Sequence, residues 1–324
     1  MSTSTLALPQ TNNWIISRNQ DLTFFICSAL IGYALLAISV VNGGLPGRFL
    51  VAFLFAVDGP HVFSTLTRAI IDGSERRRLR LLWMIGFPIC VFTVWILVLT
   101  LGGDGSFIVI ATLSHYHISK QHMGFVMIYK RKARETSDFR IDKYFTLSSL
   151  ILPFLFYLSA VLTDSTSLLL IFLLPALLLA CLYVNHQMQK ERVNKPKLLL
   201  LAGFIPLQWL AWSYMAADPH SIGRLVAVGV VVNVGHSVQY LRLMYFHNSN
   251  RYAERAGLLG LISSKWIYFV AAAVILALPG FAGTQLGLVY VRIVAVGFLF
   301  FHFVLDSRIW RIRGDAELAR ALQL

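Results

Sequence analysis

Ten apolar stretches follow one another along the chain, with short polar connections between them. Each is close to the length of about 20 residues that a helix needs to cross the hydrocarbon core of a bilayer. Because lipid offers no hydrogen-bond partners, the backbone inside a membrane must satisfy its own polar groups, as helices do. The sequence therefore predicts an all-α, polytopic membrane protein. The ten segments cover about 22–42, 48–70, 79–101, 105–129, 144–163, 167–186, 197–217, 222–247, 264–280 and 286–307.

The ten segments are expected to form one transmembrane domain over 22–307. A polar segment over 1–21 precedes this domain, and a basic tail over 308–324 follows it. Only 13% of the residues are charged, whereas soluble proteins have about 25%, and this excludes a soluble enzyme and a disordered chain. The net charge of +13 reflects membrane topology in a protein of this class. We expect no nucleic-acid partner.

Lysine and arginine are concentrated in alternate connections, which implies an even number of spans. By the positive-inside rule these connections and both termini face the cytoplasm. We therefore expect a multi-pass protein of the bacterial inner (plasma) membrane, with the lipid bilayer as a partner. The basic residues of these connections and of the tail are Arg76, Arg77, Arg78, Arg80, Lys130, Arg131, Lys132, Arg134, Arg140, Lys143, Lys190, Arg192, Lys195, Lys197, Arg251, Arg255, Lys265, Arg308, Arg311, Arg313 and Arg320.

Histidines gather on the even-numbered segments, which all run in the same direction. Six of the nine histidines fall at a similar depth, in the half of the membrane nearer the basic connections. Ionisable groups inside a bilayer are expensive and usually face the interior of a bundle. Several imidazoles at one level on four segments therefore predict a metal site, with a proton path or structural hydrogen bonding as alternatives. The six are His61, His115, His117, His122, His236 and His302, while His186 and His247 are expected at the water boundary.

Two aspartates are spaced to share a helix face with these histidines. Asp58 precedes His61 by three residues, and Pro60 between them predicts a kink in the helix. Asp306 follows His302 by four residues, a spacing that suits two ligands of one ion, or a ligand with the acceptor that orients it. We predict that Asp58 and Asp306 are carboxylate ligands or orienting groups.

The segment over 105–129 carries three histidines on two faces. His115 and His122 share one face but lie about 10 Å apart along the helix axis, so they could not readily bind the same ion. His117 lies on the other face. The sequence alone does not decide which of the three is a ligand, and all three belong to the predicted set.

Four further polar residues are predicted to act beside the ligands. Gln121 follows the histidines of the fourth segment, and Gln239 and Tyr240 continue the polar stripe that contains His236. These three are expected to orient ligands or to take part in catalysis. Lys120 is expected to pair with one of the two aspartates, an anionic head group or an oxyanion.

Imidazole and carboxylate ligands without thiolates suit iron, zinc, copper or manganese. A site among apolar helices favours a hydrophobic, lipid-like substrate and reactions such as hydroxylation, desaturation or oxidative cleavage. The sequence thus predicts a metal-dependent membrane oxidoreductase. We expect one or two non-haem iron ions in preference to zinc or haem, and an electron-donor protein as a further partner.

Two short motifs resemble known oxygenases. The Gly59-Pro60-His61 triplet, and His302-Phe303 with Asp306, are similar to elements of the histidine-rich integral-membrane iron oxygenases. That group includes lipid desaturases, alkane hydroxylases and the Brp/Blh-type β-carotene dioxygenases. The resemblance implies iron, dioxygen and an apolar substrate.

Two other functions remain open from the sequence. Two pairs of histidines on different helices would suit axial ligands of haem in an electron-transfer protein. Intramembrane histidine, aspartate and lysine, together with prolines inside the segments, would also suit a proton-coupled transporter. The extra carboxylates favour non-haem iron over haem, and the confinement of the polar groups to one layer disfavours a transport path.

Overall fold

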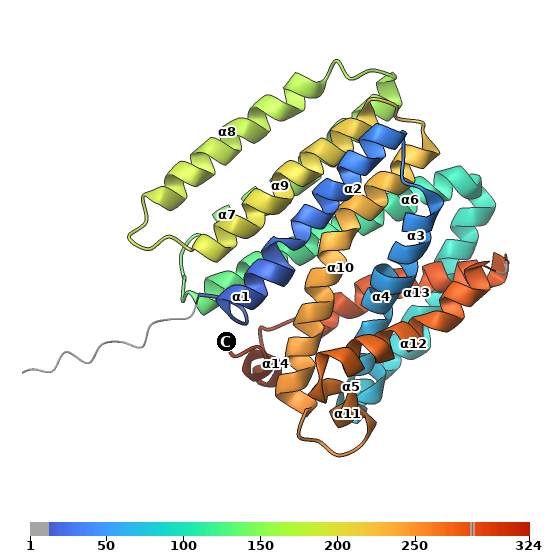
Figure 1. The fold of residues 1–324 in the computed structure, drawn as a ribbon, viewed down its shortest axis with the longest axis vertical. Coiled ribbons are helices and arrows are strands. Elements are labelled where there is room, and N and C mark those ends of the chain that lie inside the picture. The colour runs from blue at the N-terminus through green and yellow to red at the C-terminus, as the bar shows by residue number, and fades with distance from the viewer. Residues whose placement is uncertain (1–12, 286, 288) are drawn as a thin grey trace, which may run out of the picture.

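The computed structural model describes residues 13–285, 287 and 289–324, and all regular elements among them are helices. The long helices pack side by side as a bundle (Figure 1). This confirms the predicted all-α class. In chain order the elements are α1 (Arg18–Gln20), η1 (Asp21–Ile26), α2 (Ser28–Asn42), α3 (Gly47–Phe53), η2 (Leu54–Asp58), α4 (Gly59–Leu66), η3 (Thr67–Ile71), α5 (Gly73–Arg78), η4 (Leu82–Gly86), α6 (Phe87–Lys132), α7 (Phe139–Thr163), α8 (Leu169–Met188), α9 (Lys195–Ala216), α10 (Ile222–Tyr252), α11 (Leu258–Ser264), α12 (Trp266–Gln285), α13 (Val289–Ile309) and α14 (Ala316–Ala321), where η marks a π-helical stretch.

Eight helical stretches among the described residues are long and apolar enough to cross a membrane. They match eight of the ten predicted segments. The segment over 105–129 is also helical but contains the histidines and Lys120, and the segment over 264–280 contributes a shorter apolar helix, Trp266–Pro279. A total of ten spans therefore stays a prediction. The eight stretches are Arg18–Asn42, Gly47–Ile71, Leu82–Gly102, Phe139–Thr163, Leu169–Met188, Lys195–Ala216, Ile222–Tyr252 and Val289–Ile309.

Helix α6 reverses direction at Gly102, where the backbone adopts φ 67° and ψ −171°. A positive φ is readily available only to glycine. The two limbs of α6 then pack against the same turn of α13. Phe87 in the first limb lies 5.6 Å from Phe301, and His117 in the second lies 5.2 Å from His302, between ring centroids. The turn at Gly102 thus places the second limb of α6, which carries the histidines, against α13.

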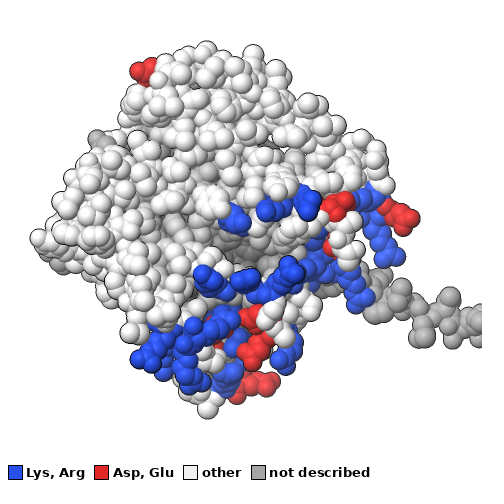
Figure 2. Space-filling model, turned by 180° about the vertical axis from the view of Figure 1, so that it is seen from behind, with Lys and Arg blue, Asp and Glu red and all other residues white. Residues whose placement is uncertain are grey.

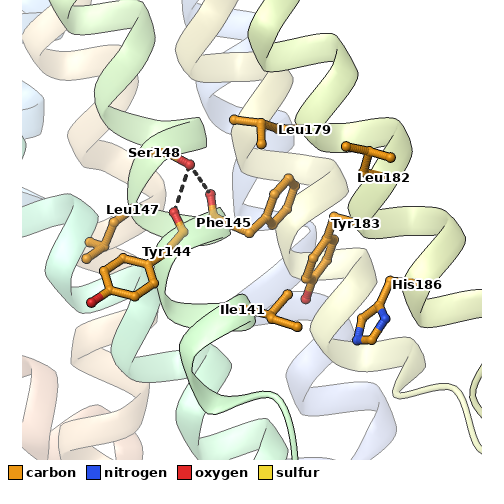
Figure 3. Close-up of a pocket in the computed structure, with 9 residues that line it drawn as sticks. All are labelled: Ile141, Tyr144, Phe145, Leu147, Ser148, Leu179, Leu182, Tyr183 and His186. Carbon is orange, nitrogen blue, oxygen red and sulfur yellow. Dashed lines mark hydrogen bonds between the residues drawn. The ribbon is translucent and has the colours of Figure 1, made fainter.

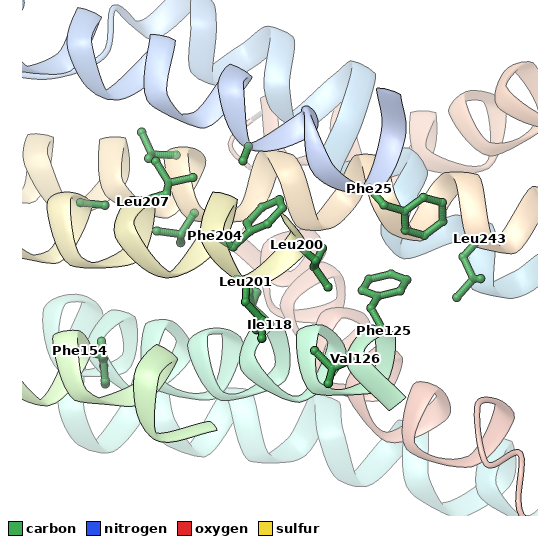
Figure 4. Packing of buried hydrophobic residues seen from close by; sticks show 14 of the residues in the cluster. Phe25, Ile118, Phe125, Val126, Phe154, Leu200, Leu201, Phe204, Leu207 and Leu243 are labelled. Atoms are coloured by element: carbon green, nitrogen blue, oxygen red, sulfur yellow. The ribbon is translucent and has the colours of Figure 1, made fainter. Parts of the chain in front are cut away.

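Helix α10 runs through the middle of the bundle and contacts α2, α4, α6 and α9. An apolar core fills the space on its α2, α6 and α9 side (Figure 4), with Phe25, Phe125 and Phe204 fully or almost fully buried. Phe204 packs directly on Gly235, since a Cβ at that position would lie 2.6 Å from the Phe204 ring. This close approach holds α9 against α10 at the residue before His236.

Lysine and arginine gather at one end of the molecule (Figure 2). Several of them are buried in ion-pair networks there. Lys197, which is fully buried, lies 2.9 Å from Glu135 and 3.2 Å from Asp142, between the ionic atoms. Lys130 pairs with the same two carboxylates. Breaking a buried pair by removing one partner typically destabilises a protein by about 3–5 kcal/mol, so these networks fix the ends of α6, α7 and α9.

A second network at this end joins the loop before α5 to the end of α10. Arg251 lies 3.2 Å from Asp72, and the hydroxyl of Tyr252 donates to the same carboxylate at 2.7 Å. Burial raises the pKa of Asp72, but hydrogen bonds from Tyr252 and Ser74 and the charge of Arg251 together hold that pKa below its usual value. The carboxylate is therefore ionised and hydrogen-bonded.

The predicted basic tail over 308–324 folds back onto the bundle. Its first two residues complete α13, and α14 follows after a short turn. Asp315 caps α14 by accepting a hydrogen bond from the Leu318 backbone at 2.8 Å. Leu318 and Leu322 are fully buried in the apolar core. The tail therefore contributes to packing as well as to the basic end.

Candidate metal centre

Four helices bring four histidine rings together. His61 of α4 lies 4.7 Å from His236 of α10 and 4.8 Å from His302 of α13, between ring centroids. His117 of α6 lies 5.2 Å from both His236 and His302. All four are buried or nearly so. The predicted meeting of histidines from separate spans is therefore present in the fold for these four.

The potential ligand atoms lie at separations that suit a shared metal ion. His61 Nε2 lies 3.2 Å from His302 Nε2, and Asp306 Oδ2 lies 3.6 Å from His302 Nε2 and 3.8 Å from His117 Nε2. Two ligands bound at about 2.1 Å to one ion stand roughly 3–3.5 Å apart. Two overlapping groups have ligand atoms within 4.8 Å of one another: His61 with His117 and His236, and His117 with His302 and Asp306.

Several ring nitrogens in this cluster have no hydrogen-bond partner. They are His61 Nδ1, His117 Nε2 and His236 Nδ1, all inaccessible to solvent. A buried polar atom without a partner costs about 1–3 kcal/mol. Unpartnered imidazole nitrogens in the same place are the arrangement expected for side chains that coordinate an ion.

A hydrogen-bond chain orients the α13 side of the cluster. The hydroxyl of Tyr240 donates to Asp306 Oδ1 at 2.7 Å and lies 2.8 Å from Thr65 Oγ1. Thr65 Oγ1 in turn lies 2.8 Å from His302 Nδ1, which leaves the Nε2 atom of that ring directed at His61. Tyr240 and Asp306 are predicted site residues, whereas Thr65 is not, although its position four residues after His61 on the same helix face was a usable signal.

Asp58 lies outside the cluster. Its Oδ1 accepts a 2.5 Å hydrogen bond from Asn233 Nδ2, one helical turn before His236. Asp58 ends the π-helical stretch η2, and a π turn rotates the residues before it relative to those after it. The spacing of three residues between Asp58 and His61 therefore does not bring both side chains to one place.

The other two histidines of α6 do not belong to the two groups of close ligand atoms. His115 Nε2 lies 2.9 Å from the Leu150 carbonyl oxygen, and its ring stacks on Phe154 at 4.7 Å. His122 lies 6.4 Å from His236 and 4.5 Å from Phe204, between ring centroids. Its Nδ1 lies 3.0 Å from the Ile118 carbonyl oxygen, and its buried Nε2 has no partner. The structure therefore groups His117, and neither His115 nor His122, with the other ligand atoms.

The predicted amide and lysine residues lie around the cluster. Gln121 Nε2 donates to the His236 carbonyl oxygen at 3.2 Å, and Gln239 Nε2 donates to the Phe25 carbonyl oxygen at 2.6 Å. Both amides thus tie helices together near the cluster. Lys120 is half-buried, and neither of the predicted aspartates forms an ion pair with it in the part of the chain that the structure describes.

The most accessible members of the cluster lie between α6 and α13. The side chains of His117 and Asp306 are 10% and 8% exposed, whereas His236 and His302 are buried. Phe303 stacks on His117 at 4.2 Å and borders this edge. A molecule reaching the cluster would therefore approach from the α6–α13 side.

A separate groove lies between α7 and α8, away from these residues. It has a volume of about 450 Å³ and apolar walls that include Phe145, Leu179 and Leu182, with Tyr183 and His186 at one end (Figure 3). Neither the histidine cluster nor its carboxylate lines this groove. Helix α8 is mostly exposed, which places the groove on the outside of the bundle.

His247, expected at the water boundary, is instead fully buried. Its Nδ1 lies 2.9 Å from Asn248 Oδ1, and its ring contacts Trp310 and Tyr252. His247 is buried because α10 continues to Tyr252 and the folded tail covers the end of that helix, so its depth in the membrane stays a prediction. His186 is about 39% exposed, as a boundary position requires.

No family model matches the chain, and no curated protein or solved structure does so either. The resemblance to histidine-rich membrane oxygenases therefore stays a prediction. It is carried by the residues of α4 and α13 alone.

Proposed function

We propose that the chain is a membrane-embedded, iron-dependent oxygenase that acts on a hydrophobic substrate. The observation that carries this proposal is the convergence of four imidazoles and one carboxylate inside an apolar helix bundle. His61, His117, His236, His302 and Asp306 would hold the ion. Imidazole and carboxylate ligands without thiolates suit non-haem iron, and bound iron would supply dioxygen activation.

A single ion is the simplest occupant of this centre. The two groups of ligand atoms share His117, and the contact of 3.2 Å between His61 and His302 joins them. Two ions are the alternative, and the amount of metal per chain distinguishes the two cases. Haem is less well supported, because these rings contact one another edge to face and a porphyrin between two of them would have to separate them.

The protein's own residues would position the reaction. Tyr240 and Thr65 hold Asp306 and His302 in place through hydrogen bonds of 2.7 and 2.8 Å. Such partners orient ligands and commonly change metal affinity by about 10–100-fold when they are removed. Tyr240 can also donate its phenolic proton to Asp306, since the two groups are already hydrogen-bonded.

The surroundings support a hydrophobic substrate that enters from the membrane. The least buried edge of the centre lies between α6 and α13, next to the ring of Phe303. Tyr116 and Leu113 on the same limb of α6 are exposed on the surface of the bundle, where lipid would cover them. Lys120, one turn from His117, would hold an anionic head group of such a substrate.

The distribution of charge supports an orientation with the basic end in the cytoplasm. Both termini would then be cytoplasmic, as expected for a bacterial inner-membrane protein, and the centre would lie in the inner half of the bilayer. A soluble electron-donor protein would dock at the basic end. The motifs on α4 and α13 are consistent with a place among histidine-rich membrane oxygenases.

Elemental analysis of the detergent-purified protein tests the proposal. We expect stoichiometric iron in the wild type, a visible spectrum without a Soret band, and loss of iron in His61→Ala, His236→Ala and His302→Ala. His115→Ala is the matched control, because this histidine is equally buried on α6 but faces Leu150. Full iron occupancy in the three variants, or a wild type that takes up no metal, would refute the assignment.

A further inference from the structure

The groove between α7 and α8 is polar at one end only. Leu179 and Leu182 of α8 line its apolar part, and Tyr183 and His186 lie at the other end (Figure 3). His186 belongs to the last turn of α8, next to the basic connection that leads to α9. The groove volume of about 450 Å³ falls within the range of about 300–1,000 Å³ that is typical of small-molecule sites. The groove therefore fits a ligand with an apolar body and a polar end.

The groove combines buried rings with exposed apolar side chains. Phe145 and Tyr183 are buried and stack with ring centroids 3.8 Å apart. The Tyr183 hydroxyl donates to Asp142 at 2.5 Å, so its hydrogen is already used. Tyr144 of α7 and Leu182 of α8 are 62% and 57% exposed. Exposed apolar side chains gathered around a hollow mark a binding surface for an apolar partner.

Three carboxylates near the start of α7 are already paired with lysines. Asp138 Oδ2 lies 3.0 Å from Lys190 Nζ and 3.3 Å from His186 Nε2. Glu135 and Asp142 are held by the two buried lysines of the network that joins α6, α7 and α9. Three lysines thus balance these three carboxylates. A ligand at the polar end of the groove meets acidic groups whose charge is already neutralised.

Two cations at the start of α7 are in excess of these pairs. In the part of the chain that the structure describes, Arg140 and Lys143 have no carboxylate within ion-pair distance. Lys143 Nζ lies 5.3 Å from the ring centroid of Tyr144, which lines the groove. Arg140 is exposed and precedes Tyr144 by one helical turn. In the connection after α8, Glu191 is adjacent to Arg192, so the excess of positive charge remains.

A phospholipid with an anionic head group matches both parts of this site. Its acyl chain would lie along Leu179 and Leu182, and its phosphate would meet Arg140 and Lys143. A guanidinium group can bind two phosphate oxygens at once, and basic pockets between membrane-spanning helices commonly bind such head groups. Because α7 and α8 are both apolar enough to cross a membrane, the bilayer itself would supply this ligand. A zwitterionic lipid has the same chains but carries its own cation, so its charge is not complementary.

We propose that the groove between α7 and α8 binds an anionic phospholipid, with an acyl chain between the two helices and the phosphate on Arg140 and Lys143. The proposed iron ligands do not line this groove, so the inference goes beyond the proposed function and does not depend on it. Helix α8 packs chiefly against α7 and is otherwise mostly exposed. A bound lipid would therefore help to fasten α8 to the rest of the bundle.

Native mass spectrometry of the detergent-purified, full-length chain tests the head-group contact. The probes are dioleoyl phosphatidylglycerol and dioleoyl phosphatidylcholine, titrated separately, so that only the head group differs. Each basic residue near an anionic lipid surface contributes about fivefold in affinity. The wild type should therefore prefer phosphatidylglycerol by about 25-fold. Arg140→Gln with Lys143→Gln should abolish this preference and leave the binding of phosphatidylcholine unchanged.

Arg311→Gln with Arg313→Gln is the matched control for this loss of charge. It removes two positive charges from exposed residues of the basic tail, which does not line the groove. This variant should keep the wild-type preference for phosphatidylglycerol. An equal loss in the control would overturn the site, because binding would then follow net charge. Equal affinity of the wild type for the two lipids would overturn it as well.

Leu182→Trp tests the apolar part of the site. Leu182 is 57% exposed, so the larger side chain can be accommodated at the surface while it fills the groove. Binding of both lipids should weaken although both cations remain, and unchanged binding would overturn the proposal. A dimer that binds neither lipid and that Leu182→Trp disrupts would show that a second copy of the chain occupies the groove. Iron enters none of these measurements, so either failure leaves the proposed function untouched.

Discussion

The two faces of the second limb of α6 use histidine in opposite ways. On one face His115 is packed between Phe154 and Trp212, with its Nε2 on the Leu150 carbonyl oxygen. On the other face His117 meets two more histidine rings and an aspartate, and its Nε2 has no hydrogen-bond partner. The residue type is the same and both side chains are at most 10% exposed, so the difference lies in what surrounds the two rings. His115 also has one buried nitrogen without a partner, Nδ1, but among the described residues no second imidazole or carboxylate joins it in a group of close ligand atoms, as happens at His117.

The largest expected effect is a loss of bound iron that a substitution on one face of α6 causes and a substitution on the other face does not. His117→Ala removes the ring shared by both ligand groups, so bound iron should fall to background. His115→Ala, two residues earlier, should retain iron at the wild-type level. Elemental analysis of both purified variants measures this difference, and equal iron in the two would show that the faces do not differ in function.

A smaller loss of metal is expected from Thr65→Val. The substitution keeps the shape of the side chain but removes the hydroxyl that contacts His302 Nδ1 and Tyr240. Iron affinity should fall by about 10–100-fold, as measured by competition with a chelator. Thr112→Val on α6 is the control, since its hydroxyl bonds only to the Ile108 carbonyl oxygen of its own helix. If Thr65→Val bound iron with wild-type affinity, Thr65 would not orient His302.

On the opposite face, His115→Phe should change stability and not metal binding. Phenylalanine can keep the stack on Phe154 but cannot donate to Leu150 O, three residues before the helix-interior Pro153. Leaving that acceptor without its partner should destabilise the fold by about 1–3 kcal/mol. Thermal unfolding in detergent measures the loss. A marked fall in iron content in this variant would contradict a purely structural role.

The smallest effect is expected from Gln121→Leu. Gln121 lies near the centre. Its side-chain Nε2 donates one hydrogen bond, to the backbone carbonyl oxygen of His236. Losing one such bond costs about 0.5–1.5 kcal/mol, so iron affinity should change by less than about tenfold. Chelator competition again provides the measurement. A complete loss of iron would place Gln121 among the ligands instead.

The sequence was sufficient for the long apolar helices and for the meeting of four of the six predicted histidines. Hydropathy located the eight long apolar helical stretches to within about five residues, because a spanning helix needs a set length of apolar residues. The spacing of four residues between His302 and Asp306 correctly predicted that both side chains meet. These features depend only on distance along one helix.

Features that depend on packing between helices could not be predicted in the same way. The choice of His117 over His115 depends on how α6 is rotated against α7 and α13, and no pattern within α6 specifies that rotation. Pro60 predicted an irregularity in this helix, but not the π-helical stretch η2, which turns Asp58 toward Asn233. The burial of His247 depends on the folded tail, which a hydropathy profile does not describe.

The proposed centre takes its residues from α4, α6, α10 and α13, so it is assembled from points spread over nearly the whole chain. His302 and Asp306 are made last, after the other three histidines. Under the proposed function, the full set of five ligand residues would be complete only once α13 has packed against the earlier helices. Biogenesis would then end with a maturation step, in which α13 completes a centre that His61, His117 and His236 begin.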